Sequence, residues 1–168
     1  MRASEWTPAP ETVRRARSRR YGRAMPGRTF TQDQVDDAID YVVDEGATDR
    51  GQTISYSRVF AAADLAPPQE LHNGGDSHLV TALMEAFHYR CSERGCPPLD
   101  ALVVHTAGSR VGEPGVGYYR INGHVDPHGR SITLEAQAAA LNLWQTQREQ
   151  CETWGTALRR GKVERPRR

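Results

Sequence analysis

The sequence predicts a single domain of the α+β class over residues 29–158, placed between two basic segments. Its length of 168 residues is typical of one domain. Apolar residues at helical spacing alternate with short apolar runs of the kind that form strands, and glycine or proline clusters separate them. We expect no membrane span, because no apolar run reaches 18 residues. Three cysteines are too few for a disulfide framework, so we expect a cytoplasmic protein.

The first predicted element is a helix that begins at a capping box. Thr31 is the N-cap, Gln34 is the third helical residue, and Phe30 with Val35 completes a hydrophobic staple. The apolar residues that follow at helical spacing are Val35, Ala38, Ile39, Val42 and Val43. Gly46 is predicted to end this helix.

A short strand and two more helices are expected next. Residues 53–55 favour a strand, and Ser55 is placed to cap a helix from Tyr56 to about Ala63. A longer helix is expected to begin near Ser77 and to end at Gly95. Its apolar stripe comprises Leu79, Val80, Leu83, Met84, Phe87 and Cys91.

The order of the remaining elements favours a winged-helix-like domain. Residues 99–105 are apolar almost throughout and are predicted to pair as a hairpin with residues 118–121, beyond a glycine-rich turn. A C-terminal amphipathic helix follows from about Thr133, with Gly155 as an alternative early end. Helix, strand, helix, helix and hairpin is the winged-helix order, in which the third helix can enter the major groove of DNA.

A net charge of only +1 conceals a strong partition of charge along the chain. Residues 1–28 carry a net charge of +6, residues 29–158 carry −10, and residues 159–168 carry +5. We interpret both ends as disordered basic tails, and such segments commonly bind nucleic acid. The alternative is that they are solvated or fold back onto the acidic body.

Several segments resemble the C-terminal domain of O6-alkylguanine-DNA alkyltransferases and the related alkyltransferase-like proteins. The segments are Thr-Ile-Ser-Tyr-Ser-Arg-Val-Phe at 53–60, Pro-Pro-Leu at 97–99, Val-Val-His at 103–105 and Gly-Val-Gly-Tyr at 115–118. The chain is also similar, over Pro-Pro-Leu, the paired valines and Pro-Gly-x-Gly-aromatic, to a group of uncharacterised small bacterial and phage proteins, a resemblance that implies no function.

The alkyltransferase resemblance covers roughly residues 31–121 and implies a DNA-binding scaffold. In that family a reactive cysteine precedes a histidine, and a helix carries an intercalating arginine. If His105 matches the family histidine, Val104 stands at the cysteine position, and the arginine position falls near His78. The resemblance therefore implies the scaffold and its partner, DNA, without alkyl transfer.

These observations together predict non-enzymatic DNA or other nucleic-acid binding, with no catalytic residue, cofactor or metal. The predicted contact residues lie in the N-terminal arm, at the start of the third helix and on the hairpin. They are Arg14, Arg15, Arg17, Arg19, Arg20, Ser77, His78, Arg110, Tyr118 and Arg120.

Two alternatives stay open at the level of sequence. Trp144 and Trp154 on the C-terminal helix could anchor a protein partner or a homodimer, which would make the chain an assembly module. The other alternative is a metal-dependent nuclease, because His124, Asp126 and His128 supply two imidazoles and a carboxylate within five residues.

Overall fold

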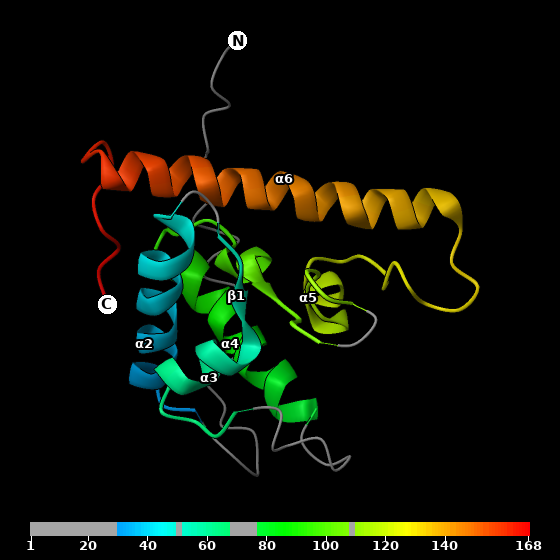
Figure 1. Cartoon of the computed structure of the whole chain (residues 1–168), viewed down its shortest axis with the longest axis horizontal. Helices are drawn as coiled ribbons and strands as arrows, with labels where there is room; N and C mark the ends of the chain where they lie inside the picture. The colour runs from blue at the N-terminus through cyan, green and yellow to red at the C-terminus, as the bar shows by residue number, and fades with distance from the viewer. Residues whose placement is uncertain (1–29, 50–51, 68–76, 108–109) are drawn as a thin grey trace.

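The computed structural model describes residues 30–49, 52–67, 77–107 and 110–168, and helices dominate its mixed α+β fold (Figure 1). The elements are α2 (Gln32–Val42), the π-helical turn η1 (Val43–Ala47), β1 (Ile54–Ser55), α3 (Tyr56–Ala62), α4 (Ser77–Glu93), the 3-10 helix η3 (Leu99–Leu102), β2 (Val103–Val104), α5 (Val116–Ile121) and α6 (Leu134–Arg159). Residues 1–29, and with them the predicted basic arm, lie outside the described residues.

The predicted capping box at the start of α2 is confirmed. The Thr31 hydroxyl accepts a hydrogen bond from the Gln34 amide at 3.2 Å, and the Gln34 side chain accepts one from the Thr31 amide at 3.0 Å. The predicted end at Gly46 is wrong, because the chain continues helically as η1. Gly46 is buried there, and a Cβ at this position would lie 3.2 Å from the Gln52 carbonyl oxygen. The glycine therefore serves a close approach and does not terminate the helix.

The sheet consists of two short parallel strands, in which Ile54 pairs with Val103 and Ser55 with Val104. Ser55 also caps α3 as expected, since its hydroxyl accepts from the Arg58 amide at 3.3 Å. Parallel pairing requires a crossover connection, and α3 and α4 supply it between the two strands.

The predicted hairpin is wrong. Residues 99–102 form η3, only 103–104 form a strand, and residues 116–121 form α5. Short buried apolar runs are compatible with helix or strand, which explains the error at 99–102. In α5 the consecutive side chains of Tyr118 and Tyr119 are both buried, which a helix inside the protein permits and a half-exposed strand does not.

Helix α4 follows the prediction closely. Most of its apolar stripe is buried against α2 and η3, and Phe87 and Leu83 are fully inside the main core. Gly95 adopts a φ of +73°, the left-handed conformation expected of a residue that follows a helix C-terminus. The apolar stripe and the C-terminal glycine were therefore sufficient to predict this helix.

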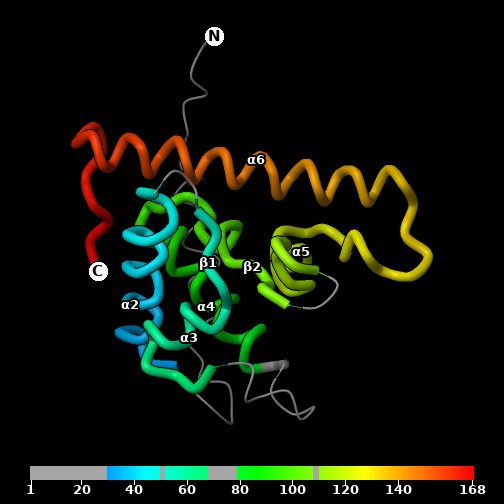
Figure 2. The backbone as a smooth tube through the Cα atoms, in the orientation of Figure 1, coloured from blue at the N-terminus to red at the C-terminus, as the bar shows by residue number. Residues whose placement is uncertain are grey.

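Helix α6 lies across the body, and its N-terminal half extends beyond α5 (Figures 1 and 2). The helix begins where predicted, and Thr133 is its N-cap, accepting a hydrogen bond from the Ala136 amide at 3.2 Å. Gly155 does not end the helix. It packs directly on η1, where a Cβ at 155 would lie only 1.9 Å from the Ala47 carbonyl oxygen.

Candidate functional site

Three of the segments that carry the alkyltransferase resemblance meet at one place. Tyr56 begins α3, His105 follows β2, and Gly115 precedes α5. The Gly115 amide donates to the Tyr56 hydroxyl at 2.8 Å, and the Tyr56 and His105 ring centroids are 5.0 Å apart. A Cβ on Gly115 would lie 3.1 Å from the Tyr56 hydroxyl and 3.2 Å from His105 Nε2, so only glycine fits without displacing them.

The titratable groups at this place are neutral near pH 7. Burial raises the pKa of Tyr56 to about 12, against the opposing effect of the hydrogen bond from Gly115. Burial also lowers the pKa of His105, and the positive charge of Arg110 lowers it further. The two side chains therefore offer hydrogen-bonding groups without a formal charge.

A nucleophile for alkyl transfer does not accompany this pair among the described residues. Val104, at the position of the family cysteine, is buried in β2. Cys91, Cys96 and Cys151 are buried among the apolar side chains of the main core. Burial raises the pKa of Cys91 and of Cys151 well above the ordinary value, which keeps both thiols protonated.

The loops beside this site are tied by charge pairs. Arg110 binds Asp126 at 2.5 Å, and His128 Nε2 contacts the Glu113 carboxylate. Burial is the largest single influence on the pKa of Asp126 and raises it, but the hydrogen bonds and positive charges of Arg110 and His128 together leave a net lowering. A guanidinium beside this carboxylate repels a cation, and in the described part of the chain no three His, Cys, Asp or Glu side chains are arranged to hold a metal. The described structure therefore does not support the alternative of a metal site at His124, Asp126 and His128.

The structure separates the predicted nucleic-acid contacts. Tyr118 is interior: its hydroxyl donates to Gln147 at 2.6 Å, and burial raises its pKa. Arg110 is held by Asp126, as described above. Arg120 is 65 % exposed on α5, 3.9 Å from Glu85. The prediction of Tyr118 as a surface contact depended on a hairpin strand at residues 118–121. The structure has helix α5 there, and this helix turns Tyr118 into the interior.

Two groups of predicted contacts are not visible at the level of side chains. Ser77 and His78 lie in the first turn of α4, and their side chains are outside the described set. The arm residues Arg14, Arg15, Arg17, Arg19 and Arg20 lie outside the described residues altogether.

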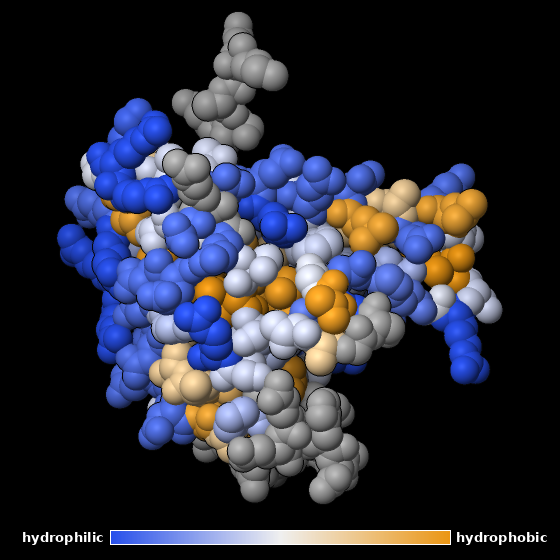
Figure 3. All heavy atoms as spheres, viewed as in Figure 1, coloured by the Kyte–Doolittle hydropathy of each residue, from blue (hydrophilic) through white to orange (hydrophobic). Residues whose placement is uncertain are grey.

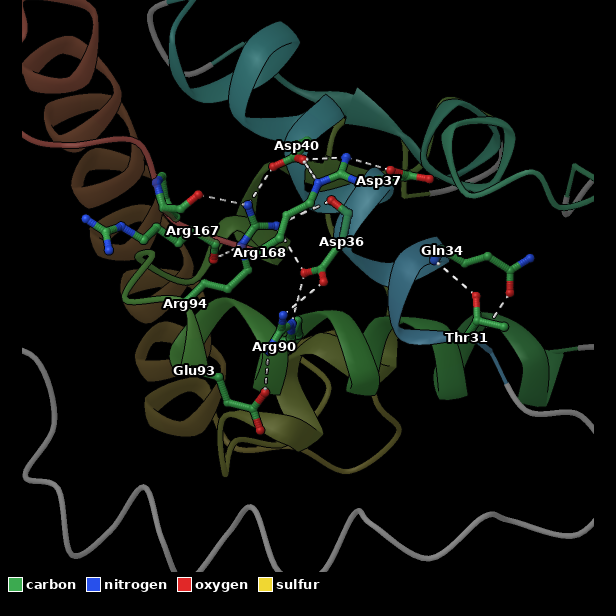
Figure 4. A network of polar contacts seen from close by, with 11 residues as sticks. Thr31, Gln34, Asp36, Asp37, Asp40, Arg90, Glu93, Arg94, Arg167 and Arg168 are labelled. Atoms are coloured by element: carbon green, nitrogen blue, oxygen red, sulfur yellow. Dashed lines mark hydrogen bonds and ion pairs between the residues drawn. The ribbon is translucent and has the colours of Figure 1, made fainter.

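The acidic face of α2, formed by Asp36, Asp37 and Asp40, is a second polar centre. The sequence indicated only an acidic body and did not single out this helix. Figure 4 shows that Arg90 of α4 and Arg94, the residue that follows this helix, reach this face. Arg90 donates twice to Asp36 at 2.9 Å, and Arg94, only 1 % exposed, donates to Asp36 at 3.2 Å and to Asp40 at 2.6 Å. Two helices are therefore joined by a buried ion-pair network.

The C-terminal tail covers the outer part of the same face. Its prediction as a disordered segment is therefore wrong, and the alternative, in which it folds back onto the acidic body, is confirmed. Arg165 pairs with Asp44 at 2.8 Å. Arg168 pairs with Asp37 at 2.7 Å and with Asp40 at 2.8 Å. Opposite charges carried by the tail and the body provide the physical reason, since each arginine gains a carboxylate partner on docking.

The two tryptophans of α6 serve the protein's own interior. The Trp144 indole donates to the Ala101 carbonyl oxygen at 2.9 Å and packs on a small cluster that includes Tyr119 and Ala140. Trp154 packs against the main core. Both indole rings thus make contacts within the protein, which does not favour them as anchors for a protein partner.

Comparison of the chain with protein-family models, with curated proteins and with solved structures found no match. Among the described helices, none has both the length and the apolar character that crossing a membrane requires.

Proposed function

We propose that the protein binds nucleic acid, DNA in the first place, without catalysing a reaction on it. In this proposal the arginine-rich arm of residues 1–28 supplies most of the affinity through phosphate contacts. The body acts as a winged-helix-like scaffold, in which α4 faces the groove and α5 takes the flanking position expected of a wing.

The distribution of charge is the observation that carries the proposal. The net charge of −10 on residues 29–158 would oppose DNA binding if it were spread evenly. Instead, five carboxylates of α2 and η1 are paired with five arginines of this chain. The carboxylates belong to Asp36, Asp37, Asp40, Asp44 and Glu45, and the arginines are Arg58, Arg90, Arg94, Arg165 and Arg168. Arg58, Arg90 and Arg94 are already counted in the −10, so only the C-terminal tail lowers it. With residues 159–168 the net charge of residues 29–168 is −5, and residues 1–28 carry +6.

The meeting of Tyr56, His105 and Gly115 supports the scaffold part of the proposal. These residues come from separate segments of the alkyltransferase resemblance and contact one another through the Gly115 amide and the paired rings. Val104 at the nucleophile position favours binding over alkyl transfer. Helix α5 packs near α4 where Gly117 faces Thr81, and it carries the exposed Arg120.

Fluorescence anisotropy with a labelled duplex tests the arm. Replacement of Arg14, Arg15, Arg17, Arg19 and Arg20 by glutamine is expected to weaken binding. It should also reduce the slope of log Kobs against log salt by up to about 4.5, at about 0.9 per lost phosphate contact. The matched control replaces the same five residues by lysine, which keeps the charge and should preserve most of the slope. Equal slopes for the glutamine variant and the wild type would overturn the role of the arm.

Arg120 tests the body separately from the arm. Arg120→Gln is expected to reduce the salt slope by about 0.9, the contribution of one phosphate contact. Arg159→Gln removes the same charge at the C-terminal end of α6 and is expected to leave the slope unchanged. If both variants behave alike, α5 does not face the nucleic acid.

A protein-interaction or assembly module is the second candidate. The N-terminal half of α6 favours it, because Leu134 is 83 % exposed and Ala140 is the fully buried residue of this segment. Figure 3 shows apolar residues gathered at this end of the helix. Sedimentation velocity over a wide concentration range distinguishes the candidates: assembly requires a concentration-dependent mass that Leu134→Gln abolishes, whereas DNA binding does not.

A further inference from the structure

The outer face of α2 and the C-terminal segment form a peptide-binding arrangement whose occupant is part of the same chain. The guanidinium of Arg168 bridges Asp37 and Asp40. Three residues earlier, Arg165 reaches Asp44, one further helical turn along. Two arginines of the tail thus meet carboxylates in successive turns of α2 and η1. Figure 4 shows the contact of Arg168 with Asp37 and Asp40.

The contact also recognises the main chain of the tail. Arg94 Nη2 donates to the Pro166 carbonyl oxygen and Arg94 Nε donates to the Arg167 carbonyl oxygen, both at 3.2 Å. Arg94 is almost completely buried, and Asp36 and Asp40 hold its guanidinium in place. Because the buried Arg94 guanidinium binds the carbonyl oxygens of two successive residues, the contact is more specific than a pairing of surface charges alone.

We propose that the acidic face of α2, with Arg94, is a binding site for an arginine-bearing segment, that residues 165–168 fill it in cis, and that this docking withholds Arg165 and Arg168 from nucleic acid. The third part, the withholding of these arginines from nucleic acid, rests on the proposed function. Carboxylates and phosphates compete for the same guanidinium groups, because both accept paired N–H donors.

The docked state is suited to displacement by a polyanion. Arg165, Arg168, Asp37 and Asp44 are each about half exposed, so water and salt screen their pairs. A duplex presents a dense row of phosphates whose neutralisation releases counterions. Nucleic acid bound first by the arm would therefore draw the tail away from α2 and gain further phosphate contacts.

Proteolysis at a unique position measures docking without any nucleic acid. Lys162 is the single lysine of the chain, so a lysine-specific protease cuts once and releases residues 163–168. The test variant is Asp37→Asn with Asp44→Asn, which removes two exposed partners of the tail arginines. The control is Asp33→Asn with Asp49→Asn, two exposed carboxylates nearby for which the described structure contains no ion pair, with the same change of charge.

We expect the test variant to be cut several-fold faster than the wild type and the control to be cut at the wild-type rate. Equal rates in the test and control variants would overturn docking. Circular dichroism of the same samples establishes that both variants are folded.

Duplex binding by the same full-length proteins tests the competition. The test variant should bind more tightly than the control, with a salt slope steeper by up to about 2, because two arginines become available to phosphates. Faster cleavage with identical slopes in both variants would overturn the competition. If no protein binds the duplex, the wild type included, the proposed function and the competition both fail, while the protease result still decides whether the tail docks.

Discussion

The two halves of α6 differ sharply in how they use one continuous apolar pattern. In the half over residues 144–159, Cys151 and Gly155 are buried and Trp154 packs on the main core. In the half over residues 134–143, Ala140 is fully buried and Leu134 is largely exposed. The helix continues through both halves without interruption.

This difference between the two halves shows that helix formation and helix packing have separate causes in this protein. The exposed half reads Leu-Glu-Ala-Gln-Ala-Ala-Ala-Leu from 134 to 141, a run of strong helix formers behind the Thr133 cap. Propensity and capping can sustain this half because Trp144 attaches its inner end to the body through Ala101. The inner half is held by close packing, and Gly155 is its tightest point.

Gly155→Ala is expected to have the largest effect on this comparison. The added Cβ meets the Ala47 carbonyl oxygen at 1.9 Å, so the backbone of α6 or η1 must move. We expect a loss of about 3 kcal/mol in the free energy of unfolding, at the upper end for overpacked sites. Urea denaturation measures it. Ala139→Gly in the exposed half is the control and should cost about 1 kcal/mol from helix propensity alone. If Gly155→Ala leaves the free energy of unfolding unchanged, the half of α6 over residues 144–159 is not held by close packing at Gly155.

Trp144→Phe tests the attachment between the halves. The phenyl ring cannot donate to the Ala101 carbonyl oxygen, so a partly buried acceptor loses its partner. The expected cost is about 1–2 kcal/mol in thermal or urea unfolding. Trp154→Phe removes a similar ring area on the inner half and serves as the reference. If hydrogen exchange in residues 134–143 does not increase in Trp144→Phe, the indole is not what attaches the outer half.

Acid is expected to release the tail that extends the inner half. Burial raises the pKa of Asp40, but hydrogen bonds from Arg94 and Arg168 lower it by more, to below the usual 3.8. A lowered folded-state pKa means that this contribution is complete above the unfolded value and is lost as the pH falls through the folded value. NMR of the Val163 and Arg168 amides between pH 6 and pH 3 should therefore show detachment below about pH 4. Detachment already near pH 6 would contradict this origin.

Leu134→Gln is expected to have the smallest effect. Its side chain is 83 % exposed, so its replacement removes almost no buried apolar surface. The change in the free energy of unfolding should stay within about 0.5 kcal/mol, as for most surface positions. A loss of 1 kcal/mol or more that depends on protein concentration would show that another molecule covers this end of α6.

The placement of the predicted contact residues, like that of the predicted helices and strands, was partly right and partly wrong. Tyr56 and His105 were not among the predicted contact residues. They lie in segments that carry the resemblance, and the structure brings them together with Gly115. Tyr118 itself was misplaced because its segment was assigned to a strand. The docking of Arg165 and Arg168 on α2 could not be selected from sequence, because many carboxylates of the body were equally eligible as partners.

The sequence by itself determined the features that depend on neighbours within one helical turn. The caps at Thr31, Ser55 and Thr133, the C-terminal glycine at 95 and the helical stripe of α4 all belong to this group. A side chain and a backbone amide three residues apart meet in almost any fold, so the local signal is enough.

Tertiary structure alone decided the features that join distant segments. It paired Ile54 with Val103 in parallel, made a helix of residues 116–121, and set Gly155 against Ala47. It also brought the C-terminus to α2. The free energy of such contacts comes from burial and pairing between groups that the sequence separates, and many alternative pairings would satisfy the same local pattern.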